Sequence, residues 1–156
     1  FIGLSEAESI TIKKAATLHD IGKIGLKENI LHKKEPLFQE ELELIRRHPI
    51  IGEDICKPLH SLKQILPGIR YHHERWDGKG YPDKLKGEEI PIIARIINVI
   101  DSFDAIVSER PYRRSYSTNE AVNLMNTEKS SGQWDPWIVE KFITMIENGP
   151  LIHKGE

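Results

Sequence analysis

The stretch "IPIIARIINVIDSFDAIV", residues 90–107, decides the fold class. Its apolar side chains recur every three or four positions, which is the spacing of one face of an α-helix. They are Ile92, Ile96, Val99, Ile100, Phe103 and Ile106. We therefore expect a long buried helix here. Because no segment shows the convincing alternation of apolar and polar residues that marks a β-strand, the predicted fold class is all-α, a helical bundle.

Sequence signals for helix starts extend this prediction to both ends of the chain. Two of them fit the capping box and one fits an N-cap followed by proline. They are Ser5 with Glu8, Ser117 with Glu120, and Asp135 with Pro136. We expect helices over roughly residues 5–19, 118–128 and 136–147.

The middle of the chain combines helical stripes with one long loop. The dipeptide His48-Pro49 predicts a helix break, and an apolar stripe from Leu62 to Ile69 predicts a helix that runs to His72 and His73. Residues 76–91 contain "DGKGYPDKLKGEE" and show no apolar periodicity. A loop this long inside a small helical domain is more often functional than idle.

Length and composition indicate one globular domain. The chain has 156 residues, and 38% of them are hydrophobic, so we expect a single domain over residues 1–150 and a polar tail over residues 151–156. The net charge of -2 gives no general attraction to a nucleic acid polymer. Cys56 is the only cysteine, which suits a reducing compartment. With no signal peptide and no transmembrane stretch in the sequence, we expect a cytoplasmic domain. Because the chain starts with Phe1, we expect it to be cut from a longer protein, and membrane attachment of that parent protein stays an open alternative.

Several histidines and aspartates stand at predicted helix ends or in apolar contexts. They are His19, Asp20, His48, His72, His73 and Asp101. A lone histidine is usually a surface or core residue, and Asp101 alone is compatible with a buried salt bridge or a helix cap. Taken together, they favour a metal site, and imidazole and carboxylate ligands without thiolate suit iron or manganese, with zinc as an alternative. The zinc-protease pattern H-E-x-x-H fails, because Asp77 stands where its second histidine is required.

Basic and aromatic residues flank these positions. Lys23 follows the His-Asp pair, and Arg110 and Arg113 follow the predicted long helix. An arginine fork suits a phosphate, and a lysine can supply a point charge or a proton to a leaving oxygen. Considered alone, Lys23, Arg110 and Arg113 are explained equally well as surface cations exposed to solvent. Trp76 and Tyr81 offer flat faces on which a purine could stack, or they anchor the loop on the core.

The motifs together resemble the HD-GYP family, a branch of the HD superfamily of metal-dependent phosphohydrolases. The match rests on "TLHDIGKIG", residues 17–25, and on "HHERWDGKGYP", residues 72–82. Three further segments resemble the family in its order, namely "RRHPIIGEDI", "IINVIDSFDAIVSERPYR" and "SGQWDPWIVEKF". A His-Asp dipeptide alone carries no weight, whereas the eleven-residue match is highly specific.

The resemblance implies an HD-type helical domain with a GYP loop that hydrolyses cyclic di-GMP, a bacterial second messenger, to pGpG or GMP through a metal-bound water. The implied cofactor is a di- or tri-nuclear iron or manganese centre. Position by position, the implied ligands are His19, Asp20, His48, His72, His73 and Asp101. Asp20 is the implied bridging carboxylate, and Lys23, Arg110, Arg113, Gly80 and Tyr81 match substrate-binding positions. Because ligand histidines must be neutral, we expect activity to fall at acidic pH.

One departure from the family leaves an alternative open. In the family a preceding helix supplies another histidine ligand, and in three-metal members a glutamate, and this chain begins where the linker after that helix is expected. The His19–Asp20–Asp101 half of the site is then short of a ligand. The alternative is a catalytically inactive HD-GYP-like module that senses nucleotide or docks a protein. A hydrolase of another nucleotide is disfavoured by the GYP loop. Regulatory or sensor domains in the parent chain and a homodimer are the expected partners besides cyclic di-GMP.

Overall fold

The computed structural model describes residues 2–33, 35–109 and 115–149, and in those ranges it contains helices and loops but no strand. The elements run α1 (Glu6–Leu18), η1 (Ile21–Gly25), α2 (Glu28–Leu31), α3 (Gln39–Ile45), α4 (His48–Cys56), η2 (His60–Ile65), α5 (Leu66–Tyr71), η3 (Gly87–Glu89), α6 (Ile92–Val107), α7 (Thr118–Glu128) and α8 (Pro136–Asn148). The all-α prediction is confirmed. Arg110, Arg113 and the predicted tail over residues 151–156 lie outside the described residues.

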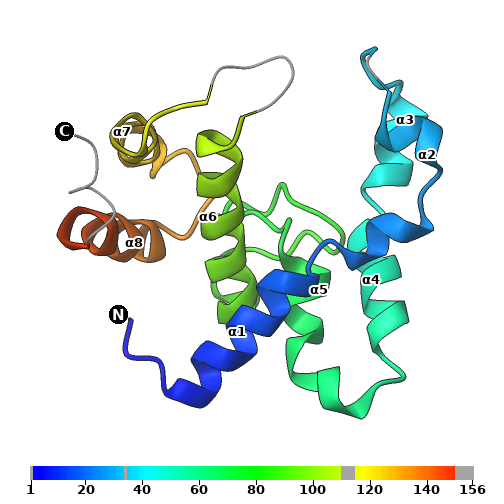
Figure 1. Ribbon diagram of the computed structural model, residues 1–156, viewed down its shortest axis with the longest axis horizontal. Coiled ribbons are helices and arrows are strands. Elements are labelled where there is room, and N and C mark those ends of the chain that lie inside the picture. The colour runs from blue at the N-terminus through cyan, green and yellow to red at the C-terminus, as the bar shows by residue number, and fades with distance from the viewer. Residues whose placement is uncertain (1, 34, 110–114, 150–156) are drawn as a thin grey trace.

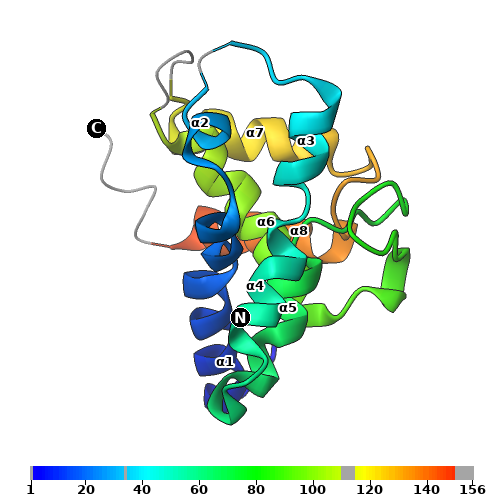
Figure 2. The same cartoon turned by 90° about the vertical axis from the view of Figure 1, so that its right-hand side faces the viewer.

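Helix α6 forms the axis of the molecule (Figure 1). Helices α7 and α8 lie on one side of it, α5 and α4 lie on the other, and α1 crosses its lower end. Helices α2 and α3 form an arm on the side away from α8 (Figure 1). Figure 2 shows the segment between α5 and α6 as an extended loop at one edge of the molecule. This arrangement leaves the loop-bearing side of α6 free to face the ends of α1, α4 and α5.

Local capping fixes the helix boundaries as the sequence predicts. The Ser5 and Ser117 capping boxes both form, with Ser5 Oγ accepting from the Glu8 amide at 3.3 Å. Asp135 Oδ1 accepts from the amide of Trp137 at 2.9 Å, so it starts α8. A side-chain acceptor at this position satisfies an amide that the helix itself leaves unpaired.

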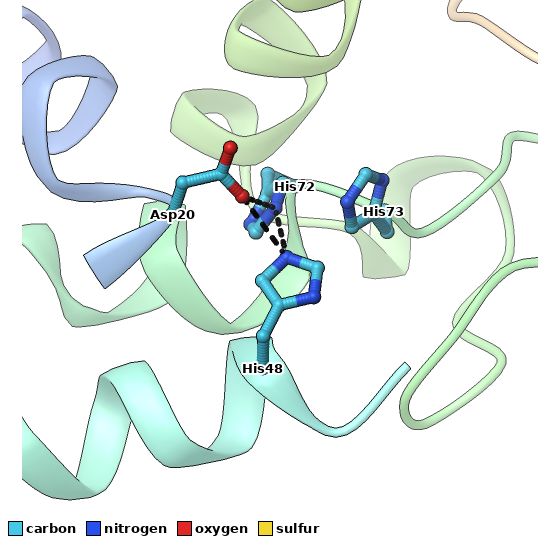
Figure 3. Close-up of side chains that lie close together, drawn as sticks. All are labelled: Asp20, His48, His72 and His73. Carbon is cyan, nitrogen blue, oxygen red and sulfur yellow. Dashed lines mark hydrogen bonds and ion pairs between the residues drawn. The ribbon is translucent and has the colours of Figure 1, made fainter. Parts of the chain in front are cut away.

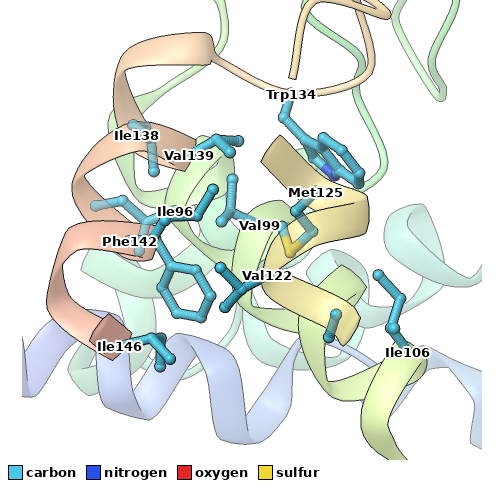
Figure 4. Packing of buried hydrophobic residues seen from close by; sticks show 12 residues of the cluster. Ile96, Val99, Ile106, Val122, Met125, Trp134, Ile138, Val139, Phe142 and Ile146 are labelled. Atoms are coloured by element: carbon cyan, nitrogen blue, oxygen red, sulfur yellow. The ribbon is translucent and has the colours of Figure 1, made fainter. Parts of the chain in front are cut away.

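Two apolar clusters surround α6. The larger one packs α6 against α7 and α8 (Figure 4), with Val99, Met125 and Val139 fully buried. The second packs α6 against α1 and α5 through Ala15, Ile69 and Ile97, among others. Burial of aliphatic side chains at roughly 25 cal/mol per Å² is the main stabilising contribution to such clusters.

Two members of the predicted buried stripe are more exposed than expected. Ile92 is 41% exposed and Ile100 is 38% exposed. Ile92 lies in the first turn of α6, where one side faces solvent, and Ile100 lines an apolar groove of about 510 Å³ bordered by α1, α6 and α8. The stripe prediction was therefore right for Ile96, Val99 and Ile106 and wrong for these two residues.

Candidate metal centre

Five of the six predicted ligands come from the ends of three elements that meet beside α6. His19 and Asp20 follow α1, His48 is the first residue of α4, and His72 and His73 follow α5. The predicted break at His48-Pro49 is confirmed, because α3 ends at Ile45 and Pro49 lies in the first turn of α4. Figure 3 shows Asp20, His48, His72 and His73 pointing toward one another.

A glycine allows two of these elements to approach. A Cβ atom on Gly22 would overlap the carbonyl of His48 and would lie 2.5 Å from the amide nitrogen of Gly52. Any side chain at position 22 would therefore push η1 away from α4. Because Asp20 precedes η1 and His48 begins α4, this close contact is what brings the aspartate and the histidine into one site.

The ligand atoms form a tight group. One atom from each of Asp20, His48, His72 and His73 lies within 4.8 Å of the others. Asp20 Oδ1 lies 3.2 Å from His48 Nε2 and 3.9 Å from His72 Nε2. The two Nε2 atoms of His48 and His72 are 3.1 Å apart. His48 and His72 are each only 1% exposed, whereas the Asp20 side chain is 37% exposed, so the two imidazoles form the buried floor of the group.

Backbone hydrogen bonds set the tautomer of three histidines. The Nδ1 atom of His19 lies 2.7 Å from the Ala16 carbonyl, and His48 Nδ1 lies 2.8 Å from the Ile45 carbonyl. His72 Nδ1 lies 2.7 Å from the carbonyl of Ile69. Because a carbonyl can only accept, each Nδ1 carries a proton and donates it, which leaves the Nε2 lone pair available for a metal.

This proton arrangement fits a cation. When both rings are neutral and carry their proton on Nδ1, the Nε2 atoms of His48 and His72 are both acceptors, and their 3.1 Å approach is then a contact between two lone pairs. Asp20 Oδ1, beside them, is buried and accepts no hydrogen bond. In this form, lone pairs from three atoms converge without a proton between them. A divalent cation would satisfy all three, and the nitrogen and oxygen donor set suits iron, manganese or zinc.

The pKa values of the buried histidines support neutral ligands. Burial and the neighbouring His73 lower the pKa of His72 to about 2. Burial and His48 lower the pKa of His73 to about 3. Both rings therefore stay neutral throughout the range from pH 5 to 8. Protonation of these two rings is therefore expected below pH 5, which is more acidic than an ordinary histidine pKa would give.

His19 has the opposite environment. Its Nε2 lies 3.4 Å from an Asp20 oxygen and 3.5 Å from an Asp101 oxygen. Burial disfavours the charged imidazole, but hydrogen bonds to Asp101 and Asp20 outweigh burial and raise the pKa of His19 to about 10. Burial opposes a charged Asp20, yet the hydrogen bonds that its Oδ2 accepts from His19 and Lys23 hold the pKa of Asp20 well below its usual range. An anionic pocket that holds a proton this firmly also suits a metal ion, which would take the place of the proton.

Asp101 joins the site from α6, although its burial was predicted wrongly. Its side chain is 39% exposed, because it lies on the side of α6 that faces the helix ends rather than on the side packed against α7 and α8. The hydrogen bond from His19 lowers the pKa of Asp101. The sequence left open a salt bridge or a metal ligand at this position, and the contact with His19 fits both.

The GYP loop is tied to the site by its acidic residues. Glu74 is 2% exposed and accepts a hydrogen bond from the Asp83 amide at 2.7 Å. Asp77 pairs with Arg75 through contacts of 3.0 and 2.8 Å. A Cβ on Gly80 would lie 2.5 Å from Glu74 Cα and 2.6 Å from the His73 carbonyl, so only glycine fits where the loop crosses the histidine turn. Glu74 and Asp77 are thus structural partners of the loop.

Lys23 and Tyr81 both contact ligand residues. Lys23 Nζ donates to Asp20 Oδ2 at 2.6 Å. The Tyr81 ring stacks on His73 with 4.8 Å between centroids and 29° between planes. Burial raises the pKa of Tyr81 well above its usual range, so its hydroxyl stays protonated. The stacking on His73 supports an anchoring role for Tyr81, and its stacking on a purine stays a prediction.

Another side chain of the protein covers one face of the Trp76 ring. The guanidinium of Arg95 lies over it, 5.7 Å from its centroid. Its anchoring role is therefore supported as well, and base stacking on Trp76 stays a prediction.

Sequence reasoning missed the residues that complete the cleft. A cavity of about 270 Å³ lies beside the ligands and is lined by His72, His73, Arg75, Tyr81, Asn98, Asp101, Ser102, Ala105 and Gln133. Asn98 Nδ2 donates to the carbonyls of His72 and Glu74 at 3.0 and 2.9 Å. The only sequence signal for Asn98 was its polar side chain within the apolar run of residues 90–100, and such an interruption does not indicate which groups the side chain contacts.

By its fold and site, the molecule is a helical domain that gathers three imidazoles and a shared carboxylate into a centre fit for a divalent cation. The chain belongs to the HD domain family, whose pattern matches residues 2–138, and its GYP segment places it with the HD-GYP type. None of the described helices is both long and apolar enough to cross a membrane.

Curated proteins and a solved structure show the same similarity. The chain is 44% identical over 158 residues to a cyclic di-GMP phosphodiesterase of Thermotoga maritima, covering 99% of this chain and 42% of that protein. It is 36% identical over 140 residues to the 3'3'-cGAMP-specific phosphodiesterase 2 of Vibrio cholerae, covering 88% of this chain and 27% of that protein. A crystal structure of a cyclic GMP-AMP specific phosphodiesterase of V. cholerae (V-cGAP3) is similar with a TM-score of 0.73 and 25% identity, covering 97% of this chain and 41% of that one. The chain therefore spans less than half the length of these relatives.

Proposed function

We propose that this chain is a metal-dependent phosphodiesterase that hydrolyses a cyclic dinucleotide, with cyclic di-GMP as the preferred substrate and pGpG or GMP as the product. The observation that carries the proposal is the convergence of two Nε2 lone pairs and the unpaired Asp20 Oδ1 in a buried group beside a polar cleft. Such a donor set binds a metal, and metal sites of this type hydrolyse phosphate esters. The relative named for cyclic di-GMP, at 44% identity, favours that substrate over 3'3'-cGAMP.

The residues that would hold the ions fall into two overlapping groups. Asp20, His48, His72 and His73 form one, and His19, Asp20 and Asp101 form the other, so Asp20 is the natural bridge. We propose a di- or tri-nuclear iron or manganese centre. When bound, such ions supply Lewis acidity toward a phosphoryl oxygen and an activated water.

The remaining groups act on the substrate. Lys23 Nζ sits 2.6 Å from the bridging carboxylate, where its charge can stabilise a phosphoryl oxygen or its proton can go to the leaving oxygen. Tyr81, fixed on His73, borders the cleft together with the Gly80 crossing. Arg110 and Arg113 are proposed as further phosphate contacts. We also propose that the domain works in the cytoplasm under regulatory or sensor domains of the parent chain, and that it forms a homodimer.

The test combines metal content with turnover. The purified chain is reconstituted anaerobically with Fe(II) or with Mn²⁺, its metal is counted by elemental analysis, and release of pGpG and GMP is followed by chromatography. We expect turnover of cyclic di-GMP above that of 3'3'-cGAMP. His72→Ala removes a ligand that is 1% exposed, so it should lower bound metal and abolish turnover. His60→Ala, at an exposed histidine outside the site, is the matched control and should change neither.

Two outcomes would contradict the proposal. Equal turnover in the wild type and in His72→Ala would show that the metal centre is not the catalyst. Tight binding of cyclic di-GMP without turnover, in protein whose metal sites are shown to be filled, would favour the inactive sensor or docking module instead.

A further inference from the structure

Arg46 is a cation beside the centre that the catalytic proposal does not use. It follows α3 and lies two residues before His48, which is one of the buried ligands. Its guanidinium lies over the Tyr81 ring, 5.6 Å from the ring centroid. Tyr81 in turn stacks on His73 at 4.8 Å. One aromatic ring therefore separates this guanidinium from a metal-ligand imidazole.

The backbone around Arg46 is fixed by its neighbours. The amide of Arg46 donates to the carbonyl of Leu42 at 3.0 Å, and the amide of Arg47 donates to that of Leu44 at 3.1 Å. Since His48 is fully packed in the site, the short connection from α3 to α4 has little freedom to move away. A side chain held at its base and resting on an aromatic ring loses less entropy on binding an anion than a free one does.

Arg46 forms no ion pair with a carboxylate in the described part of the chain. Four other cations near the site are paired: Lys23 with Asp20, Arg70 with Asp83 and Glu53, Arg75 with Asp77, and Arg95 with Asp135. The adjacent Arg47 is also without an ion pair among the described residues, but unlike Arg46 it does not lie over the Tyr81 ring. Arg46 makes its cation–π contact with Tyr81 and has no ion pair with a described residue. It is exposed, so its donors are open to a ligand that approaches the cleft. A planar guanidinium of this kind binds a phosphate through two parallel hydrogen bonds.

We propose that Arg46 binds the second phosphate of a cyclic dinucleotide, the one that does not react. The inference rests on the proposed function and adds a specificity determinant to it. A cyclic dinucleotide carries two phosphodiesters in one ring, so when one lies at the metal ligands the other must lie a short, fixed distance away. Arg46 stands one ring beyond His73, at the Tyr81 edge of the site, and offers the positive charge that the second phosphate requires.

The experiment compares two substrates that differ in the number of phosphates. Cyclic di-GMP engages both positions, whereas bis(p-nitrophenyl) phosphate has a single phosphate and engages the metal position alone. For Arg46→Ala we expect KM for cyclic di-GMP to rise about tenfold more than KM for the model diester, a loss at the low end of the range for hydrogen bonds to a charged group, because the guanidinium is exposed to solvent. The effect should fall on KM rather than on kcat, because an interaction with the non-reacting phosphate is the same in the ground state and in the transition state.

Three variants serve as controls. Arg47→Ala removes the neighbouring exposed cation and should not discriminate between the two substrates, which excludes a general electrostatic effect. Arg46→Lys keeps the charge but loses the fork, so it should recover only part of the KM difference. Arg46→Gln repeats the charge removal with a longer side chain, and thermal melting of each variant checks that the fold is intact.

The outcomes separate the two levels of inference. If the wild type turns over both substrates and Arg46→Ala raises both KM values equally, or neither, only the assignment of Arg46 is overturned. If the wild type turns over the model diester but not cyclic di-GMP, the proposed substrate is refuted and the role of Arg46 with it. If the metal-loaded wild type turns over neither substrate, the proposed function fails as a whole.

Discussion

Asn98 is expected to hold the double-histidine turn in place, and its replacement offers a direct test. Its amide group donates to the carbonyls of His72 and Glu74 at 3.0 and 2.9 Å, so one side chain of α6 spans the turn that presents His72 and His73. Asn98→Ala deletes both hydrogen bonds. Each such bond contributes about 1 kcal/mol net, so we expect the free energy of unfolding to fall by about 2 kcal/mol. For a domain of this size that loss lowers Tm by roughly 4–8 °C.

The matched control is Asn123→Ala, on the exposed face of α7. Both substitutions gain the same helix propensity, about 0.5 kcal/mol in favour of alanine, so the difference between the two variants isolates the hydrogen bonds. Urea unfolding of the metal-free protein measures this difference. Because the turn also orients the ligands, Asn98→Ala should weaken metal binding roughly 10-fold to 100-fold as well. A difference below about 0.5 kcal/mol, together with unchanged metal affinity, would refute the reasoning.

Two further predictions concern pH and the loop. In the folded protein the pKa values of His72 and His73 lie at about 2 and about 3, below the ordinary histidine value near 6.5. Between pH 6.5 and pH 3 these two rings therefore bind more protons in the unfolded chain than in the folded protein. The stability of the metal-free protein should therefore fall as pH falls from about 6.5, by up to about 1.4 kcal/mol per pH unit for each ring, and a urea midpoint equal at pH 7 and pH 5 would contradict this. Arg70 joins the loop to α4 and α5 through Asp83 at 2.9 and 3.0 Å and Glu53 at 2.5 Å. Because Arg70 is partly exposed, Arg70→Gln should lower the free energy of unfolding by about 1–2 kcal/mol, measured by the same urea unfolding. A double-mutant cycle with Asp83→Asn measures the coupling between the two side chains, and a coupling energy near zero would contradict a stabilising role of the Arg70–Asp83 pair.

Local signals in the sequence predicted most of the fold. Asp135 before a proline starts α8, and the Ser5 capping box starts α1, because these interactions involve residues only a few positions apart. The exposure of Ile100 and Asp101 could not be predicted in the same way. Periodicity tells which residues share a face of a helix, but the neighbours of that face are set by tertiary packing.

In the candidate site, too, residues with a local sequence signal could be predicted and residues placed by long-range contacts could not. His72 and His73 were identifiable because they sit together at a helix end beside a glycine loop. Arg46 and Asn98 were missed, because their contacts with Tyr81 and with the histidine turn join segments far apart in the sequence. The tautomers of the ligand histidines were equally out of reach, since each depends on the direction of a carbonyl at the end of a helix.

Those carbonyls give the centre a property beyond coordination. His19, His48 and His72 each bond back to a carbonyl three residues earlier, at or near the ends of α1, α3 and α5, where helix carbonyls lack partners of their own. A helix end that frays would therefore rotate an imidazole out of the site, and an ion in the site would resist the fraying of all three ends at once. Terminal turns, ordinarily the first parts of a helix to open, thus become a single cooperative unit whose opening free energy rises with the occupancy of the centre.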